Sequence, residues 1–233
     1  CMIPPWLTIV SIVSLITAFA SAALAVIDIR KRPQPMAVMN PVWPITALYF
    51  GPIGLWAYYA LGRAAKPQPA KISKNSGHRH HKKPEQPFWV STFVGSTHCG
   101  AGCTLGDIIA EFLVFFTGAA FVGSTFGTEL LLDYAFAFTL GVAFQYFSIA
   151  PMRGLGLKDG IIAAVKADFL SLTAFEVGLF GWMTLMRFVF FGPQLHPDSP
   201  VYWFMMQIGM IIGFATTYPM NWFLVRAGIK EAM

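Results

Sequence analysis

Residues 95–111, with the sequence GSTHCGAGCTLGDIIAE, bring together side chains that can ligate a metal ion or carry a proton. They include His98, Cys99, Cys103, Asp107 and Glu111. The last four stand at successive i, i+4 positions, so on an α-helix they share one face, which drifts by about 40° at each step. The spacing therefore predicts a polar, sulfur-bearing helix face.

Two thiols four residues apart with an imidazole beside them form a soft to borderline ligand set. Such ligands favour copper(I) first and zinc second. We therefore predict a metal site headed by Cys99 and Cys103, with His98 as a third ligand or a supporting group. Asp107 and Glu111 would neutralise charge or relay ions and protons.

Two other interpretations of this stretch stay open. Asp107 and Glu111 could simply hydrogen-bond to a neighbouring helix. Cys99 and Cys103 could exchange a disulfide, but Cβ atoms four apart on a helix are about 6 Å from each other, and a disulfide needs about 4 Å. Redox chemistry therefore requires CGAGC to be non-helical.

The elements that must position these residues are membrane helices. Apolar residues make up 56% of the 233 residues and charged residues only 12%, about half the charged fraction of a soluble domain. Apolar segments of roughly 20 residues, long enough to cross a bilayer, recur along the chain. We expect an all-α, polytopic bundle in contact with lipid.

Six spans are predicted, and one of them is ambiguous. Pro41, Pro44 and Pro52 interrupt the second segment and favour a kink or a break. The alternative is five spans plus a re-entrant Pro-rich segment. The six segments are roughly 6–27, 37–62, 99–122, 130–150, 161–190 and 201–225.

The basic residues predict the orientation, because Lys and Arg collect on the cytoplasmic side of membrane proteins. Six spans with a cytoplasmic N-terminus place eleven loop charges inside and three outside, the three being Arg30, Lys31 and Arg32. Five spans with an external N-terminus place all fourteen inside. The net charge of +5 is thus explained without a nucleic-acid partner, and the plasma (inner) membrane is the expected location.

Three regions follow from this organisation. Residues 1–62 form an N-terminal helical pair, 63–87 a basic His/Lys-rich cytoplasmic linker, and 88–233 a four-helix membrane core that carries the cysteine motif. His78, His80 and His81 in the linker could collect metal transiently. The chain begins at Cys1, which is conceivably a processed lipoprotein cysteine.

Further groups could extend the site into an ion path. Glu176 and Gln145 lie at mid-membrane depth, where polar side chains are costly and face other protein. Met206 and Met210 offer thioethers, although methionine usually fills gaps in apolar packing. Lys166 and Asp168 are expected at the inner interface.

Four segments resemble a multi-spanning membrane-protein family known only as a domain of unknown function and found mostly in bacteria. They are THCGAGCTLGDIIAEF, FQYFSIAPMRGLG, KADFLSLTAFEVG and YWFMMQIGMIIGFATTYPMNW. HCGAGCTLGD is the most distinctive of these motifs. The resemblance implies a helical membrane fold and no established activity.

The function classes left open are therefore three. The first is a membrane protein that binds or conducts a soft metal ion through the Cys-x3-Cys site. The second is a structural or accessory subunit of a membrane complex or homo-oligomer, and the third a membrane thiol–disulfide protein. Phosphate-binding loops, nucleophile elbows and H-E-x-x-H are absent from the sequence, so an enzyme is not favoured.

Overall fold

A computed structural model describes residues 3–64, 87–121, 124–192 and 195–230. These residues form seven α-helices, and π-helical turns Tyr58–Gly62 and Met186–Phe191 extend α3 and α6. The predicted all-α class is confirmed. The helices are α1 (Pro5–Lys31), α2 (Met39–Phe50), α3 (Pro52–Ala57), α4 (Phe88–Thr117), α5 (Thr125–Arg153), α6 (Leu157–Leu185) and α7 (Pro200–Arg226). Cys1 and the linker histidines His78, His80 and His81 lie outside the described residues.

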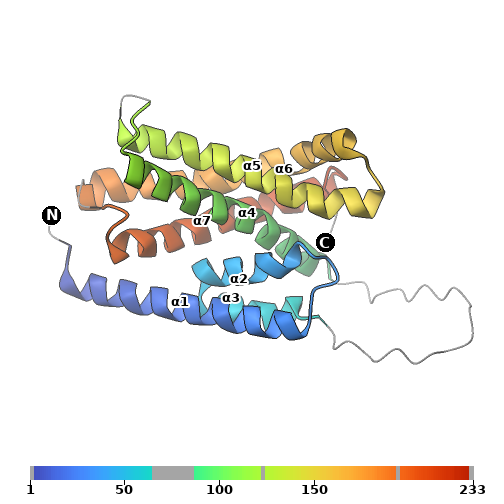
Figure 1. Cartoon of the computed structure of the whole chain (residues 1–233), viewed down its shortest axis with the longest axis horizontal. Coiled ribbons are helices and arrows are strands. Elements are labelled where there is room, and N and C mark those ends of the chain that lie inside the picture. The colour runs from blue at the N-terminus through green and yellow to red at the C-terminus, as the bar shows by residue number, and fades with distance from the viewer. Residues whose placement is uncertain (1–2, 65–86, 122–123, 193–194, 231–233) are drawn as a thin grey trace, which may run out of the picture.

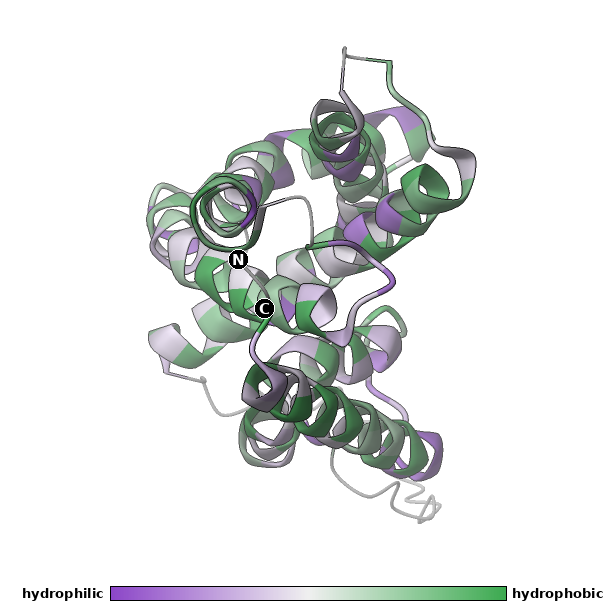
Figure 2. Cartoon of the chain, turned by 90° about the vertical axis from the view of Figure 1, so that its left-hand side faces the viewer, coloured by the Kyte–Doolittle hydropathy of each residue, from purple (hydrophilic) through white to green (hydrophobic). Residues whose placement is uncertain are grey.

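Five helices, α1 and α4 to α7, are long and apolar enough to span a membrane. Hydrophobic residues predominate along these ribbons (Figure 2). On α1, Ile16 and Phe19 are 63% and 64% exposed, which lipid tolerates and water would not. The protein is an integral membrane protein.

The Pro-rich segment does not cross the bundle. It forms a helical hairpin, α2 followed by α3, whose two arms lie along the same half of α1 and return to one end (Figure 1). Gly51 makes the turn with a φ of +58°, a conformation that favours glycine. A Cβ on Gly54 would lie 3.0 Å from the Ala47 Cα atom, so the arms pack closely. The expected sixth span is therefore corrected to the re-entrant alternative.

The tip of the hairpin is held by polar contacts to two membrane helices. Pro52 has no N–H to donate to the Leu48 carbonyl four residues earlier. The Gln207 Nε2 atom on α7 donates to that carbonyl instead, at 2.6 Å. The Ser14 hydroxyl on α1 donates to Gln207 Oε1 at 2.8 Å. One amide side chain thus joins α1, the hairpin and α7.

The third predicted span begins earlier than expected. α4 starts at Phe88 rather than near 99, so the cysteine motif lies within the helix and not at its head. Ser96 and Thr97 therefore do not cap the helix start. Their hydroxyls donate to the carbonyls of Thr92 and Val94 within α4. Four Ser and Thr residues within 88–98 hide the helix start, because their hydroxyls usually mark caps or loops.

Glycines set the spacing between the central helices. A Cβ on Gly102 would lie 2.9 Å from the Gly141 Cα atom, and one on Gly106 would overlap the Ala137 backbone. At Gly102 and Gly106 the backbone of α5 therefore lies directly against α4. Gly213 similarly admits the Phe175 carbonyl of α6.

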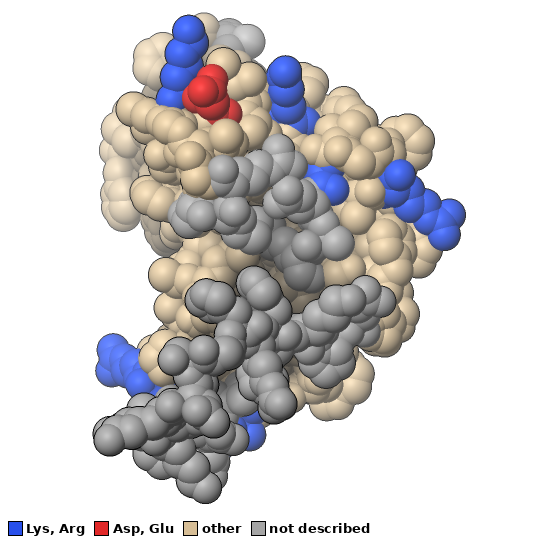
Figure 3. All heavy atoms as spheres, turned by 90° about the vertical axis from the view of Figure 1, so that its right-hand side faces the viewer, with Lys and Arg blue, Asp and Glu red and all other residues tan. Residues whose placement is uncertain are grey.

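Basic side chains gather at one end of the bundle. The C-terminal end of α1, both ends of the hairpin and the start of α4 meet there (Figure 1). Figure 3 shows Lys and Arg around the rim of this end. The N-terminus lies at the opposite end from the C-terminus (Figure 1). This is the charge distribution expected for five spans.

Candidate functional site

α4 is the central helix of the bundle. It packs against α2, α5, α6 and α7. In its most apolar 18-residue stretch 61% of the residues are buried, against 28% in the corresponding stretch of α1. A helix in this position can carry polar side chains that lipid would reject. The candidate site is built on it.

The predicted polar face of α4 points into protein. None of the five predicted site residues on this helix is more than 3% exposed: they are His98, Cys99, Cys103, Asp107 and Glu111. The four residues at i, i+4 spacing, from Cys99 to Glu111, form a row about 18 Å long at 1.5 Å per residue. We call this row the α4 file.

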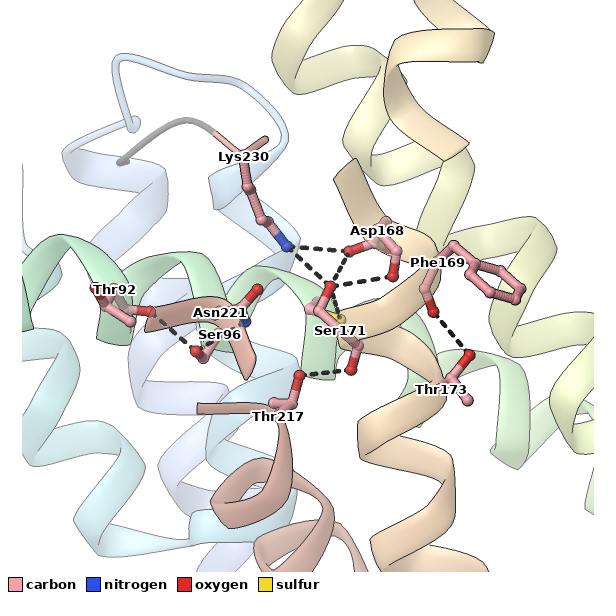
Figure 4. Close-up of polar contacts among 10 residues, drawn as sticks. Thr92, Ser96, Asp168, Phe169, Ser171, Thr173, Thr217, Asn221 and Lys230 are labelled. Carbon is pink, nitrogen blue, oxygen red and sulfur yellow. Dashed lines mark hydrogen bonds and ion pairs between the residues drawn. The ribbon is translucent and has the colours of Figure 1, made fainter. Parts of the chain in front are cut away.

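The end of the file nearest the basic end of the bundle meets α6. The Cys99 thiol donates to the Ser171 hydroxyl, with sulfur and oxygen 3.7 Å apart. Ser171 in turn donates to Asp168 Oδ1 at 3.0 Å, and the Lys230 ammonium donates to the same oxygen at 3.1 Å. Figure 4 shows Asp168, Ser171 and Lys230 turned toward one another. The file therefore ends on a buried ion pair.

The middle of the file faces a second acid. Glu176, from α6, lies beside Cys103 and close enough to Asp107 for their charges to interact. Both Asp107 carboxyl oxygens are buried without a hydrogen-bond partner among the residues that the structure describes. Buried polar atoms are normally paired, and both Glu176 carboxyl oxygens also lack a described partner, so the middle of the file is the least satisfied part of this face.

The far end of the file meets three helices at a narrow pocket. Glu111 lines it together with Glu129 and Asp133 of α5, Arg187 at the end of α6, and Tyr202 of α7. Glu111 Oε2 and Asp133 Oδ1 are buried and find no hydrogen-bond partner within the described part of the chain. Acidic groups thus continue from the file toward the end of the bundle that lies opposite the basic face.

The file does not converge on a single metal centre. Among residues 3–64, 87–121, 124–192 and 195–230, no three His, Cys, Asp or Glu side chains are arranged to hold a metal ion. The His98 ring lies against Phe144, with centroids 5.9 Å apart. The geometry places these side chains in a row along α4, and no three of the described ones form a cluster that could hold a metal ion.

The other predicted path residues are buried, but not all join the file. Glu176 does, beside Cys103, and Met206 lines the pocket that Glu111 also lines. Met210 instead lines a groove with Leu15 of α1, in surroundings that are almost entirely apolar. Gln145 is buried on α5, where its Oε1 atom has no described hydrogen-bond partner.

A family model described as "Domain of unknown function (DUF4396)" matches residues 88–230. The chain belongs to this family. No curated protein and no solved structure is detectably similar to it.

The DUF4396 match coincides with a structural unit. It begins at the first residue of α4, covers α5 and α6, and ends at Lys230 just after α7. The whole α4 file and the ion pair that ends it belong to the DUF4396 region. α1 and the hairpin precede it, although the hairpin reaches the file: a Cβ on Gly100 would lie 2.9 Å from the Tyr49 hydroxyl.

The ion pair at the basic end of the DUF4396 region was missed by sequence reasoning. Asp168 was expected at the inner membrane interface but is fully buried. It can be buried because Lys230, just after α7, supplies the compensating charge. Lys166 is exposed, as an interfacial lysine should be. The only local signal was the i, i+3 spacing of Asp168 and Ser171, which places both on one helix face.

Proposed function

We propose that this membrane protein binds a soft transition metal ion at Cys99 and Cys103 and conducts it through the bundle. Copper(I) is the first candidate and zinc the second. The observation that carries the proposal is that the whole α4 file is buried against protein, inside a bundle of helices apolar enough to span a membrane. Placing acids and thiols at this depth costs free energy, and function is the usual reason for keeping them.

The ligand count favours copper(I) over zinc. Thiolates are soft ligands that select copper(I), and the two sulfurs stand one helical turn apart on α4. Structural zinc takes four ligands and catalytic zinc at least three from protein. Among the described residues, no His, Cys, Asp or Glu side chain joins the two cysteines in a group of three ligands. Zinc would therefore need ligands from outside the described residues.

The neighbouring acids give the proposal its chemistry. A cysteine binds metal as a thiolate, so binding releases a proton that must go somewhere. Glu176 beside Cys103 is the nearest acceptor, and Asp107 lies next along the file. In the proposed step both S–H bonds would break, the two sulfurs would bind the metal, and the ionised carboxylates of Glu176 and Asp107 would take the two protons. Net charge in the interior then stays low as the cation enters.

The orientation follows from the basic end. Because Lys and Arg favour the cytoplasmic side, the end with Arg63, Lys158 and Arg226 would face the cytoplasm, and the N-terminus the outside. We place the protein in the plasma (inner) membrane on this argument. The Lys230 end of the file is then its cytoplasmic end.

Copper binding by the purified full chain tests the proposal. Copper(I) is titrated anaerobically against a competing chelator, for the parent and for the double variant Cys99→Ser/Cys103→Ser. We expect the parent to hold stoichiometric copper and the double variant to lose it. Cys1→Ser, which removes the third thiol of the chain, is the matched control and should bind as the parent does. Equal binding by the double variant, with an unchanged Tm, refutes the proposal.

The thiol–disulfide alternative gains no support from the geometry. α4 is helical through both cysteines, and both are free thiols. The non-helical CGAGC segment that a disulfide would require is not formed. Alkylation of both cysteines without prior reduction would separate the two functions in the same preparation.

A further inference from the structure

Lys230 is a cation held inside the bundle by a short segment after the last helix. α7 ends at Arg226, and Gly228 turns the chain with a φ of +70°. The amides of Ile229 and Lys230 then donate to the Leu224 carbonyl, at 3.0 and 3.2 Å. The turn sends the lysine back toward the helices, where only 3% of it remains exposed.

The Lys230 ammonium is bound by two oxygens of α6. It lies 3.1 Å from Asp168 Oδ1 and 3.1 Å from the Ser171 hydroxyl. That hydroxyl also accepts a hydrogen bond from the Cys99 thiol, while the Ser171 carbonyl accepts one from the Thr217 hydroxyl at 2.6 Å. Figure 4 shows Lys230, Asp168 and the Ser171 hydroxyl meeting, with Thr217 bonded to the Ser171 carbonyl on the other side. The ammonium therefore stands one side chain away from the α4 file.

In this part of the bundle, several buried polar atoms take no part in the hydrogen bonds of the Lys230 ammonium. Within the described ranges, Asp168 Oδ2, Asn221 Oδ1 and both His98 nitrogens are buried without hydrogen-bond partners. The absence of a side chain at Gly141 leaves room for the carboxylate, because a Cβ there would lie 2.9 Å from Asp168 Oδ2. A purely structural ion pair gains stability only when its remaining lone pairs and protons are satisfied. This pair leaves the second Asp168 oxygen, Oδ2, without a hydrogen-bond partner among the described residues.

We propose that Asp168 and Ser171 form a binding site for a small monovalent cation of the ammonium type, and that Lys230 is its tethered occupant. With the lysine in place, the site at the basic end of the α4 file is filled and a free cation is excluded. Withdrawal of Lys230 requires the turn after α7 to open, which breaks two backbone hydrogen bonds to Leu224 and the contacts of the ammonium with Asp168 and Ser171. The inference does not depend on which ion Cys99 and Cys103 bind.

Chemical rescue of Lys230→Ala tests this inference. The variant removes the ammonium and its stem, and methylammonium is the probe that can replace them. The full chain is purified in detergent with methylammonium present throughout, then exchanged into choline chloride of equal ionic strength. Choline is a cation too large for the space that the lysine leaves.

We expect the Tm of Lys230→Ala to fall in choline and to rise again with methylammonium. A ligand that binds only the folded state stabilises it by mass action, and at ten times its dissociation constant the rise is about 3–5 °C for a chain of this size. The parent should not respond, because its site is filled. The neutral pair Asp168→Asn/Lys230→Met should not respond either, because its site has no negative charge.

Two results would overturn the inference. One is a Tm of Lys230→Ala that is the same in methylammonium and choline. The other is failure to recover folded Lys230→Ala even with methylammonium, while Asp168→Asn/Lys230→Met is recovered. In that case the lysine has a structural role that a free cation cannot replace. Neither result bears on copper binding, which the Cys99→Ser/Cys103→Ser experiment measures separately.

Discussion

Gly106 offers the sharpest test of how the α4 file is positioned. A Cβ at this position would overlap the backbone of Ala137 on α5, and backbone cannot move aside as a flexible side chain can. Overpacking of this kind costs about 1–3 kcal/mol. Gly106→Ala also gains up to about 1 kcal/mol of helix propensity, so the net loss of stability alone is hard to interpret.

Gly95→Ala is the matched control, since it makes the same change in the same helix. A Cβ on Gly95 would meet no atom within 4 Å, so this variant gains the helix propensity without the overlap. The difference between the two variants therefore isolates the contact with Ala137. It should amount to about 1–3 kcal/mol, or about 2–4 °C in Tm for each kcal/mol.

Thermal unfolding of both variants in one detergent, followed by tryptophan fluorescence, measures this difference. We expect Gly95→Ala to melt at or above the parent Tm and Gly106→Ala clearly below Gly95→Ala. If Gly106→Ala melts as high as Gly95→Ala, α5 does not approach α4 as closely as described. The reasoning that places the α4 file against α5 would then be wrong.

Two further predictions concern the hairpin and the topology. Gln207→Leu leaves the Leu48 carbonyl without its donor and should cost about 1–3 kcal/mol in unfolding free energy; a Tm equal to that of the parent would mean that water or another group replaces the amide. Five spans place the two ends of the chain on opposite sides of the membrane, so reporters fused at residue 1 and after residue 233 should give opposite signals, whereas six spans require equal ones.

The long helices could be predicted from sequence because their apolar runs exceed what a soluble domain needs. Four of the five spans were located to within about five residues at each end. α4 was placed too late because its first turns are rich in serine and threonine, whose hydroxyls bond to carbonyls within the helix. Hydropathy alone cannot distinguish such a polar helical turn from a loop.

The hairpin and the ion pair depend on contacts that no local pattern contains. The Pro-rich segment is apolar enough to cross, and what turns it back is one glycine with positive φ and a glutamine 159 residues away. Lys230 meets Asp168 across 62 residues of sequence. The inward direction of the α4 file, by contrast, follows from the cost of acids in lipid and could be predicted from i, i+4 spacing alone.

The even number of crossings in α4 to α7 has a consequence for how such a unit can be combined with others. Because four helices cross, this part of the chain enters and leaves at the same membrane face, so segments joined to either of its ends meet it on that face. The α2–α3 hairpin respects that rule, since it departs from and returns to one face and delivers the chain to α4 on the correct side. The N-terminal segment thus lies beside the four-helix unit, to which it adds Tyr49 next to Gly100 and the Leu48 carbonyl that accepts from Gln207 of α7.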